Sequence, residues 1–201
     1  MEFKTCITIF NEAINNYHVT DHVDQAISNP HAAGSISNLL YKKSWIDTVQ
    51  WHLEDIIRDP EINDGEGIKI KRRIDKSNQD RTDLVEQIDD WFNQELATIE
   101  PKPNARLNTE SIAWVLDRIS ILSLKLFHMK EQVDRTDVSE SHAHKCQIKY
   151  NVLLEQEQDM KRSYTELISD IKSGERVVKV YRQMKMYNDE SLNPILYKNK
   201  K

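Results

Sequence analysis

The side chains most able to do chemistry are polar residues that interrupt an otherwise apolar helical stripe. At 100° per residue, a stripe through Ile74 passes Ser77, Asn78 and Arg81 before it becomes apolar again at Val85. A buried guanidinium needs a partner, because an unpaired buried charge costs several kcal/mol. The pattern therefore predicts that Arg81 either meets an acid inside the fold or lines a cleft.

A second segment, 111–129, is apolar almost all round and is typical of a central helix. Its few ionisable residues are Asp117, Arg118, Lys125 and His128. Asp117 and His128 are eleven residues apart, about three turns, and therefore share a face, whereas Arg118 and Lys125 share an adjacent one. A neutral imidazole both donates and accepts hydrogen bonds, which suits either acid/base chemistry or a core hydrogen bond.

These residues, with His52 and Glu54 of a third apolar segment, predict a polar layer across the protein interior. Candidate catalytic residues are His128, His52, Glu54 and Asp117, and candidate ligand-binding residues are Ser77, Asn78, Arg81, Arg118 and Lys125. We expect His128 to contact Arg81, Asn78 or a residue of segment 35–59. Two interpretations stay open: a site for an anionic ligand, or a network of ion pairs that fixes the helix register.

No metal ligands are expected, and the sequence identifies no cofactor. His18 and His22 are spaced i, i+4 and could share a metal, but two histidines near a helix C-terminus more often complement its dipole. Cys6 and Cys146 are too few for a disulfide framework in a chain of 201 residues.

The elements that must position these residues are helices, because every Gly and Pro falls between or at the ends of segments with helical periodicity. The predicted fold is an all-α, single-domain bundle of five to six helices over residues 1–190, with a tail at 191–201. The predicted helices span 3–23, 35–59, 66–96, 109–133, 137–173 and, more briefly, 175–187.

The longest predicted helix, 137–173, carries a heptad-like seam and a capping-box-like pair, Asp137 and Glu140. The seam residues are Cys146, Tyr150, Leu153, Glu157, Met160, Tyr164, Leu167 and Ile171. Such a seam packs against a neighbouring helix or against a second copy of the chain. Packing within the chain is favoured, because other amphipathic helices are at hand, and a homodimer through this seam is the alternative.

Composition limits the classes of function. The net charge of −5 argues against general nucleic-acid binding. The most apolar segment, 119–127, is too short and too often interrupted to cross a membrane, and we identify no signal peptide. These features predict a soluble protein of the cytoplasm, and the absence of glycine-rich loop motifs excludes the glycine-loop nucleotide folds.

Four blocks of sequence together resemble a bacterial family of unknown function, numbered 4254. They are WIDTVQWHLEDIIRDP (45–60), KRRIDKSNQDRTDLVEQID (71–89), SIAWVLDRISILSLKLFHMKEQV (111–133) and VYRQMKMYNDESLNPILY (180–197). The resemblance covers nearly the whole chain. It implies an uncharacterised protein of this size and a distant connection with envelope sugars, and it supplies no catalytic residues.

A partial similarity to all-α nucleoside-triphosphate pyrophosphohydrolases, which bind magnesium through paired acids, involves Glu54, Asp55, Glu86 and Asp89. The chain departs from that pattern because Gln50 and Trp51 stand where a second acid should precede Glu54. The leading hypothesis is therefore an interior site for an anionic, phosphate- or sugar-nucleotide-like ligand. A scaffold or interaction protein with a structural polar core is the alternative, and a metal-dependent phosphohydrolase comes third.

Overall fold

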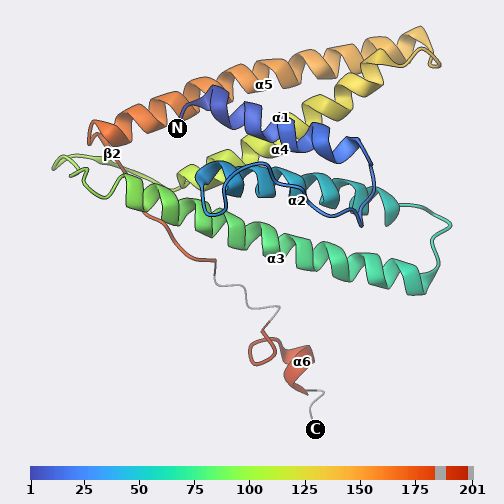
Figure 1. The fold of residues 1–201 in the computed structure, drawn as a ribbon, viewed down its shortest axis with the longest axis horizontal. Coiled ribbons are helices and arrows are strands. Elements are labelled where there is room, and N and C mark those ends of the chain that lie inside the picture. Colours follow the sequence, from blue (N-terminus) through green and yellow to red (C-terminus); the bar gives the residue numbers. More distant parts are fainter. Residues whose placement is uncertain (184–188, 199–201) are drawn as a thin grey trace.

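The computed structural model describes residues 1–183 and 189–198 and has the all-α bundle that the sequence predicts. Its elements are α1 (Phe3–His18), α2 (Ile36–Ile56), α3 (Asp64–Glu95), β1 (Arg106–Asn108), α4 (Ile112–Asp134), α5 (Glu140–Lys172), β2 (Arg176–Val178) and α6 (Pro194–Lys198). In Figure 1, α4 crosses the middle of the bundle, with α5 along one side, α3 along the other, and α6 away from the packed helices. Within the described residues, no helix is long and apolar enough to span a bilayer.

Four helices begin at a side chain that caps the first turn. Ser35, Asn63, Ser111 and Ser139 each accept a hydrogen bond from the backbone N–H three residues later. Such caps satisfy N–H groups that have no partner inside the helix. The cap predicted at Asp137 is therefore wrong by two residues.

The predicted ends of two helices are also corrected. The first helix ends at His18 rather than near residue 23, and Asp21 soon afterwards adopts a left-handed φ of 52°. The helix predicted over 175–187 is absent from the described part of that segment, residues 175–183. Its first residues form β2, which pairs in parallel with β1, and Met184 and Tyr187 lie outside the described residues.

A glycine turn explains why the chain changes direction there. Gly174 ends α5 with a φ of 76°, a conformation that strains any residue with a Cβ. A Cβ at this position would also lie 2.9 Å from the carbonyl oxygen of Glu100. The turn directs the chain into β2 beside β1, in place of a further helical segment.

The main core lies where α1, α2, α4 and the C-terminal halves of α3 and α5 meet. Phe10, Leu40 and Ile119 are fully buried there, and α5 contributes Tyr164 and Leu167 to the same cluster. This half of the α5 seam therefore packs within the chain. Further toward its N-terminus, α5 leaves large apolar side chains exposed: Ile148, Val152 and Leu154.

Candidate functional site

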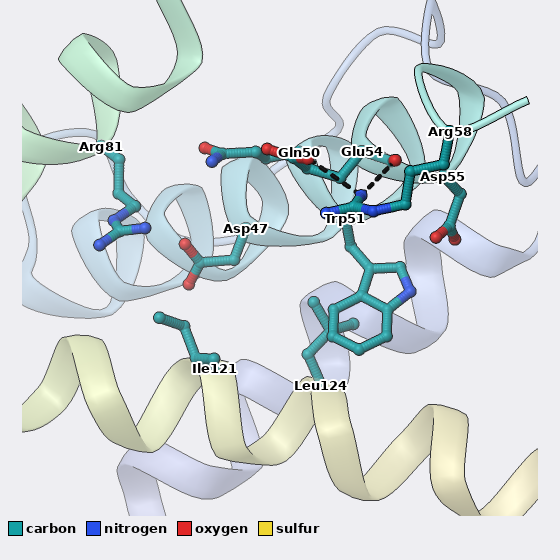
Figure 2. A pocket seen from close by; sticks show the side chains of 9 residues that line it. All are labelled: Asp47, Gln50, Trp51, Glu54, Asp55, Arg58, Arg81, Ile121 and Leu124. Atoms are coloured by element: carbon teal, nitrogen blue, oxygen red, sulfur yellow. Dashed lines mark hydrogen bonds and ion pairs between the residues drawn. The ribbon is translucent and has the colours of Figure 1, made fainter. Parts of the chain in front are cut away.

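Two of the polar residues predicted from the sequence, Glu54 and Arg81, line a cavity of about 330 Å³ between α2, α3 and α4. Figure 2 shows Arg81 and Asp47 at one end, the paired side chains of Arg58 and Glu54 toward the other, and Trp51 below that pair, beside Leu124 of α4. The cavity is lined by Asp47, Gln50, Trp51, Glu54, Asp55, Arg58, Arg81, Ile121 and Leu124.

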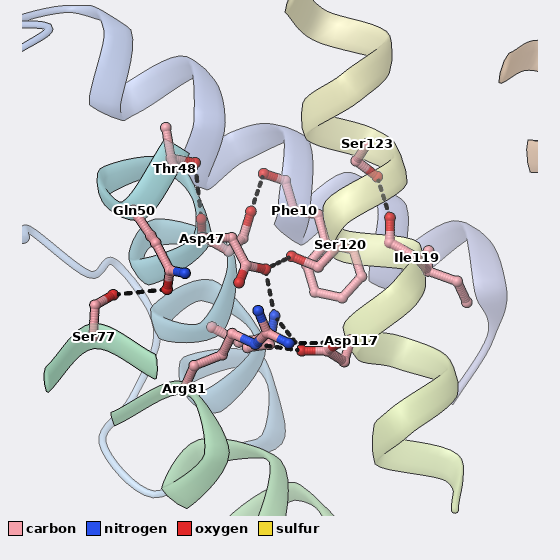
Figure 3. Close-up of polar contacts among 12 residues, drawn as sticks. Phe10, Asp47, Thr48, Gln50, Ser77, Arg81, Asp117, Ile119, Ser120 and Ser123 are labelled. Carbon is pink, nitrogen blue, oxygen red and sulfur yellow. Dashed lines mark hydrogen bonds and ion pairs between the residues drawn. The ribbon is translucent and has the colours of Figure 1, made fainter. Parts of the chain in front are cut away.

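A buried ion cluster adjoins the cavity and is formed by Lys43, Asp47, Arg81, Asp117 and Ser120. Figure 3 shows the last four of these residues close together. Lys43 is 1% exposed, pairs with Asp47, and lies 2.9 Å from Oδ1 of Asp117. Arg81 Nε lies 3.1 Å from the same Asp117 oxygen, and Ser120 donates to Asp47 at 2.6 Å. Two cations thus offset two buried carboxylates.

The electrostatics of this cluster are set by burial. Burial raises the pKa of the Asp47 carboxyl, because desolvation disfavours its charged form, while the nearby charge of Lys43 acts in the opposite direction. A buried pair of this kind is stable only when each charge keeps its partner. Each charge of the buried ion cluster therefore has a partner, while Arg81 and Asp47 also border the cavity.

A second link joins α2 to α3. Ser77 donates to Oε1 of Gln50 at 3.1 Å (Figure 3). Gln50 in turn donates to Oδ1 of Asn78 at 3.0 Å. Gln50 therefore uses its acceptor and its donor on neighbouring residues of α3. These bonds hold the middle of the α3 stripe against α2, with Arg81 one turn further along.

The structure brings together Ser77, Asn78, Arg81 and Asp117 of the predicted layer and separates the others from it. Arg118 is exposed and pairs with Glu110, and Glu54 pairs with Arg58 near the protein surface. Lys125 and His128 line a different opening. No single interior layer therefore unites the predicted ligand-binding residues.

Lys43, Asp47 and Ser120 are the members of the ion cluster that sequence reasoning did not assign to it. Lys43 and Asp47 are spaced i, i+4, a spacing that usually indicates an exposed ion pair. Their burial could have been predicted from the helical register, because both lie on the same side of α2 as Leu40, which is fully buried. Because α2 is covered on more than one side, its charged flank is buried together with its apolar stripe.

The second opening, the α2–α4–α5 cleft, has a volume of about 680 Å³. It is lined by Trp51, Asp55, Lys125, His128, Met129, Gln132, Ile148, Lys149, Val152 and Leu153. Within the described part of the chain, Lys125 and Lys149 have no ion-pair or hydrogen-bond partner. The cleft thus combines an apolar wall with two unpaired ammonium groups.

His128 lies between this cleft and two other histidines. Its ring stacks on Trp51, with centroids 4.8 Å apart and an interplanar angle of 12°, and packs edge-on against His18 and His52. Its Nδ1 lies 2.8 Å from a carboxylate oxygen of Glu131. The expected contact with the second helix is present, and the alternative contacts with α3 are not among its neighbours in the described residues.

Comparison with known proteins gives one match. The family model described as "Protein of unknown function (DUF4254)" matches residues 37–180, well over half of the chain. The chain belongs to the DUF4254 family. No curated protein and no solved structure matches it. The DUF4254 match spans α2 to β2 and so contains the ion cluster and the cleft, whereas α1, with His18, precedes it.

The carboxylates that suggested a phosphohydrolase have other partners in this DUF4254 protein. Glu86 pairs with Arg182 at 3.2 Å. Asp89 accepts hydrogen bonds from Ser111 Oγ at 2.8 Å and from the backbone N–H of Ala113 at 3.2 Å, at the start of α4. In the described residues, no three of Glu54, Asp55, Glu86 and Asp89 converge as ligands for one ion.

Proposed function

We propose that this DUF4254 protein binds an anionic small molecule with an apolar part in the α2–α4–α5 cleft. The observation that carries the proposal is the placement of Lys125 on α4 and Lys149 on α5 along one cleft, neither with a partner among the described residues. Ammonium groups bind phosphate or carboxylate through charge-assisted hydrogen bonds. Among the described residues, Asp55 is the one acid in the lining, so the two lysines outnumber it.

The wall of the cleft supports the apolar part of the ligand. Ile148 and Val152 are 51% and 48% exposed, and Trp51 adds an aromatic surface to the same lining. Contiguous exposed apolar side chains on a monomer commonly mark a binding site. A phosphate- or sugar-nucleotide-like ligand fits this description, with its anionic group at the lysines and its base against the wall.

The ligand site is thus the cleft and not the predicted interior layer, and the ion cluster has a structural role. Arg81 is paired with Asp117, and His128 contributes part of the cleft wall. The cytoplasm remains the proposed location. Two buried free thiols, Cys6 and Cys146, support it, because reducing compartments keep such thiols unpaired.

The test uses two fluorescent probes that share their aromatic rings and differ in charge. Anilinonaphthalene sulfonate carries one negative charge, and N-phenyl-1-naphthylamine carries none. We expect Lys149→Glu to weaken binding of the sulfonate by about 10-fold or more, as loss of a charge-assisted contact should, and to leave the neutral probe nearly unchanged. UDP-glucose should displace the sulfonate, and inorganic phosphate should do so less well.

Lys161→Glu is the matched control, because Lys161 is an exposed lysine of the same helix and does not line the cleft. It changes the net charge equally and should leave both probes unaffected. Equal weakening by both variants would mean that the sulfonate senses overall charge, and would refute the cleft site. Failure of UDP-glucose to compete would remove the sugar-nucleotide class.

A second candidate function is self-association, favoured by the exposed apolar row Ile148, Val152 and Leu154 on α5. In this alternative the row packs against a second copy, and the protein acts as an interaction module instead of a ligand-binding one. Light scattering after size-exclusion chromatography separates the two. A dimer that Val152→Glu converts to a monomer supports the interaction module, and a monomer at all concentrations supports the ligand site.

A further inference from the structure

Three histidines from three different helices meet at one place. His18 ends α1, His52 lies near the end of α2, and His128 lies in the second half of α4. One ring nitrogen of each lies within 4.8 Å of the other two, and the Nε2 atoms of His18 and His52 are 3.2 Å apart. His22, which the sequence paired with His18, is instead exposed to solvent. We call this group the histidine cluster.

The outer hydrogen bonds of two of these rings leave their inner nitrogens unprotonated, so each can accept a hydrogen bond or bind a cation. Nδ1 of His18 lies 2.7 Å from the carbonyl oxygen of Ile14, and Nδ1 of His128 lies 2.8 Å from the Glu131 carboxylate. Both oxygens are acceptors, so each Nδ1 carries the proton and each Nε2 presents a lone pair. Metal-binding histidines commonly have this arrangement, with the second nitrogen donating to a carbonyl or carboxylate.

One of these inner nitrogens has no partner among the described residues. Nε2 of His128 is buried and makes no hydrogen bond within the described structure. A buried polar atom without a partner costs free energy, and native proteins rarely retain one without a reason. A bound cation would satisfy this atom and would take the place of the hydrogen bond between Nε2 of His18 and Nε2 of His52.

Aromatic neighbours hold the rings in position. Tyr17 stacks on His52 at 5.1 Å between centroids and 13° between planes, and Trp51 stacks on His128. Phe127 packs against His18 at 4.3 Å. Burial also lowers the pKa of His52, which favours the neutral form that a metal ion requires. The histidine cluster is therefore held in shape before any ligand arrives.

A fourth donor stands at the open side. Oδ1 of Asp21 lies 3.6 Å from Nε2 of His52, on a residue whose φ of 52° is uncommon outside glycine. Its side chain is 56% exposed, so water can also reach the site. Three imidazole nitrogens with one carboxylate oxygen or water form a tetrahedral donor set that suits Zn²⁺, whereas Mg²⁺ and Ca²⁺ prefer oxygen ligands.

We propose that His18, His52 and His128 bind one divalent transition-metal ion, Zn²⁺ or a cation of similar preference, with Asp21 or water as the fourth ligand. In a tetrahedral site with Zn–N bonds of about 2.0–2.1 Å, ligand nitrogens lie about 3.3 Å apart. The His18–His52 separation already matches this spacing. The ring nitrogen of His128 lies within 4.8 Å of the other two. A rotation of its side chain that moves this nitrogen by about 1.5 Å would bring it to the required spacing.

This proposal goes beyond the ligand cleft and does not depend on it. The two share His128, but the lysines of the cleft are not members of the histidine cluster. Lys149→Glu should therefore leave metal binding intact, and His18→Gln should leave binding of the anilinonaphthalene sulfonate intact. Failure of one proposal is thus distinguishable from failure of the other.

The experiment is calorimetric titration of the chelator-treated full chain with Zn²⁺ at neutral pH, with Mg²⁺ as the comparison ion. We expect one Zn²⁺ per chain and no heat from Mg²⁺. His18→Gln and His128→Gln should each weaken Zn²⁺ binding by more than about 100-fold, since even outer partners of such ligands contribute 10- to 100-fold. His22→Gln is the matched control and should bind Zn²⁺ as the parent does.

A second measurement on the unmodified chain removes any dependence on how the variants fold. In ¹⁵N spectra of the histidine rings, Zn²⁺ should shift the Nε2 resonances of His18, His52 and His128 and leave His22 unchanged. Absence of Zn²⁺ binding, equal loss of binding in His22→Gln, or shifts confined to histidines outside the cluster would each overturn the proposal.

Discussion

Replacing Lys43 by Met tests the buried ion cluster most severely. Lys43 is 1% exposed, and its ammonium faces the carboxylates of Asp47 and Asp117, which are 3% and 4% exposed. Methionine approximates the aliphatic part of the lysine side chain and removes only the charge. Asp117 keeps Arg81 as a partner, so Asp47 is the carboxylate left with an uncompensated charge.

The expected cost is large, because removing one partner of a buried ion pair destabilises a protein by about 3–5 kcal/mol. For a domain of this size, that loss lowers the melting temperature by about 6–20 °C. Lys43→Met combined with Asp47→Asn should recover at least about 2 kcal/mol, since it removes both charges and keeps the Ser120 hydrogen bond. The penalty of the single variant should also be smaller at acid pH, where Asp47, whose pKa burial already raises, takes up a proton.

Urea unfolding followed by circular dichroism gives these free energies directly. Lys42→Met is the control, because Lys42 is the exposed neighbour on α2, and it should change stability by no more than about 0.5 kcal/mol. A cost below about 1 kcal/mol for Lys43→Met, or a double variant as unstable as the sum of the two single ones, would refute the buried pairing.

Three further changes have defined outcomes. Gly174→Ala should cost about 2 kcal/mol in thermal unfolding, because φ is 76° and the new Cβ meets Glu100; an unchanged melting temperature would contradict the turn. In a Cys146→Ser background, Cys6 should react with Ellman's reagent only as fast as the protein unfolds, because burial makes it inaccessible and raises its pKa to about 11; rapid native-state reaction would be contrary evidence. Burial raises the pKa of Asp89, so its ionisation costs stability as pH rises above about 4. The free energy of unfolding of Asp89→Asn, measured with urea, should therefore increase relative to that of the parent protein between pH 4 and 7. A difference between the two proteins that does not change with pH would exclude this cost.

The helices could be predicted from the sequence because their signals are local. Glycine, proline and a periodicity of 3.6 residues place five long helices to within a few residues. The helix predicted after Gly174 is wrong because Val177 and Tyr181 are spaced as on a helix, whereas pairing with β1 depends on a strand about 70 residues earlier. Sequence spacing carries no information on that partner.

The candidate site was predictable only in part, for the same reason. Arg81 stands in an apolar stripe, and that fact alone predicts an acid or an opening; the structure supplies both, in Asp117 and the adjoining cavity. Which faces of α1, α2 and α4 meet is decided by tertiary packing. The histidine cluster therefore has no sequence signature, and Lys43 looks like an ordinary flank of its helix.

The most direct test of the ligand cleft is an NMR titration of the chain labelled with ¹⁵N at tryptophan. Trp51 lines the cleft, whereas Trp91, which packs on Phe92 of α3, does not. Addition of UDP-glucose should shift the indole resonance of Trp51, identified by its loss in Trp51→Phe, and leave that of Trp91 in place. A Trp51 resonance that does not move at saturating UDP-glucose, or a shift confined to Trp91, would contradict the assignment of the cleft as the binding site.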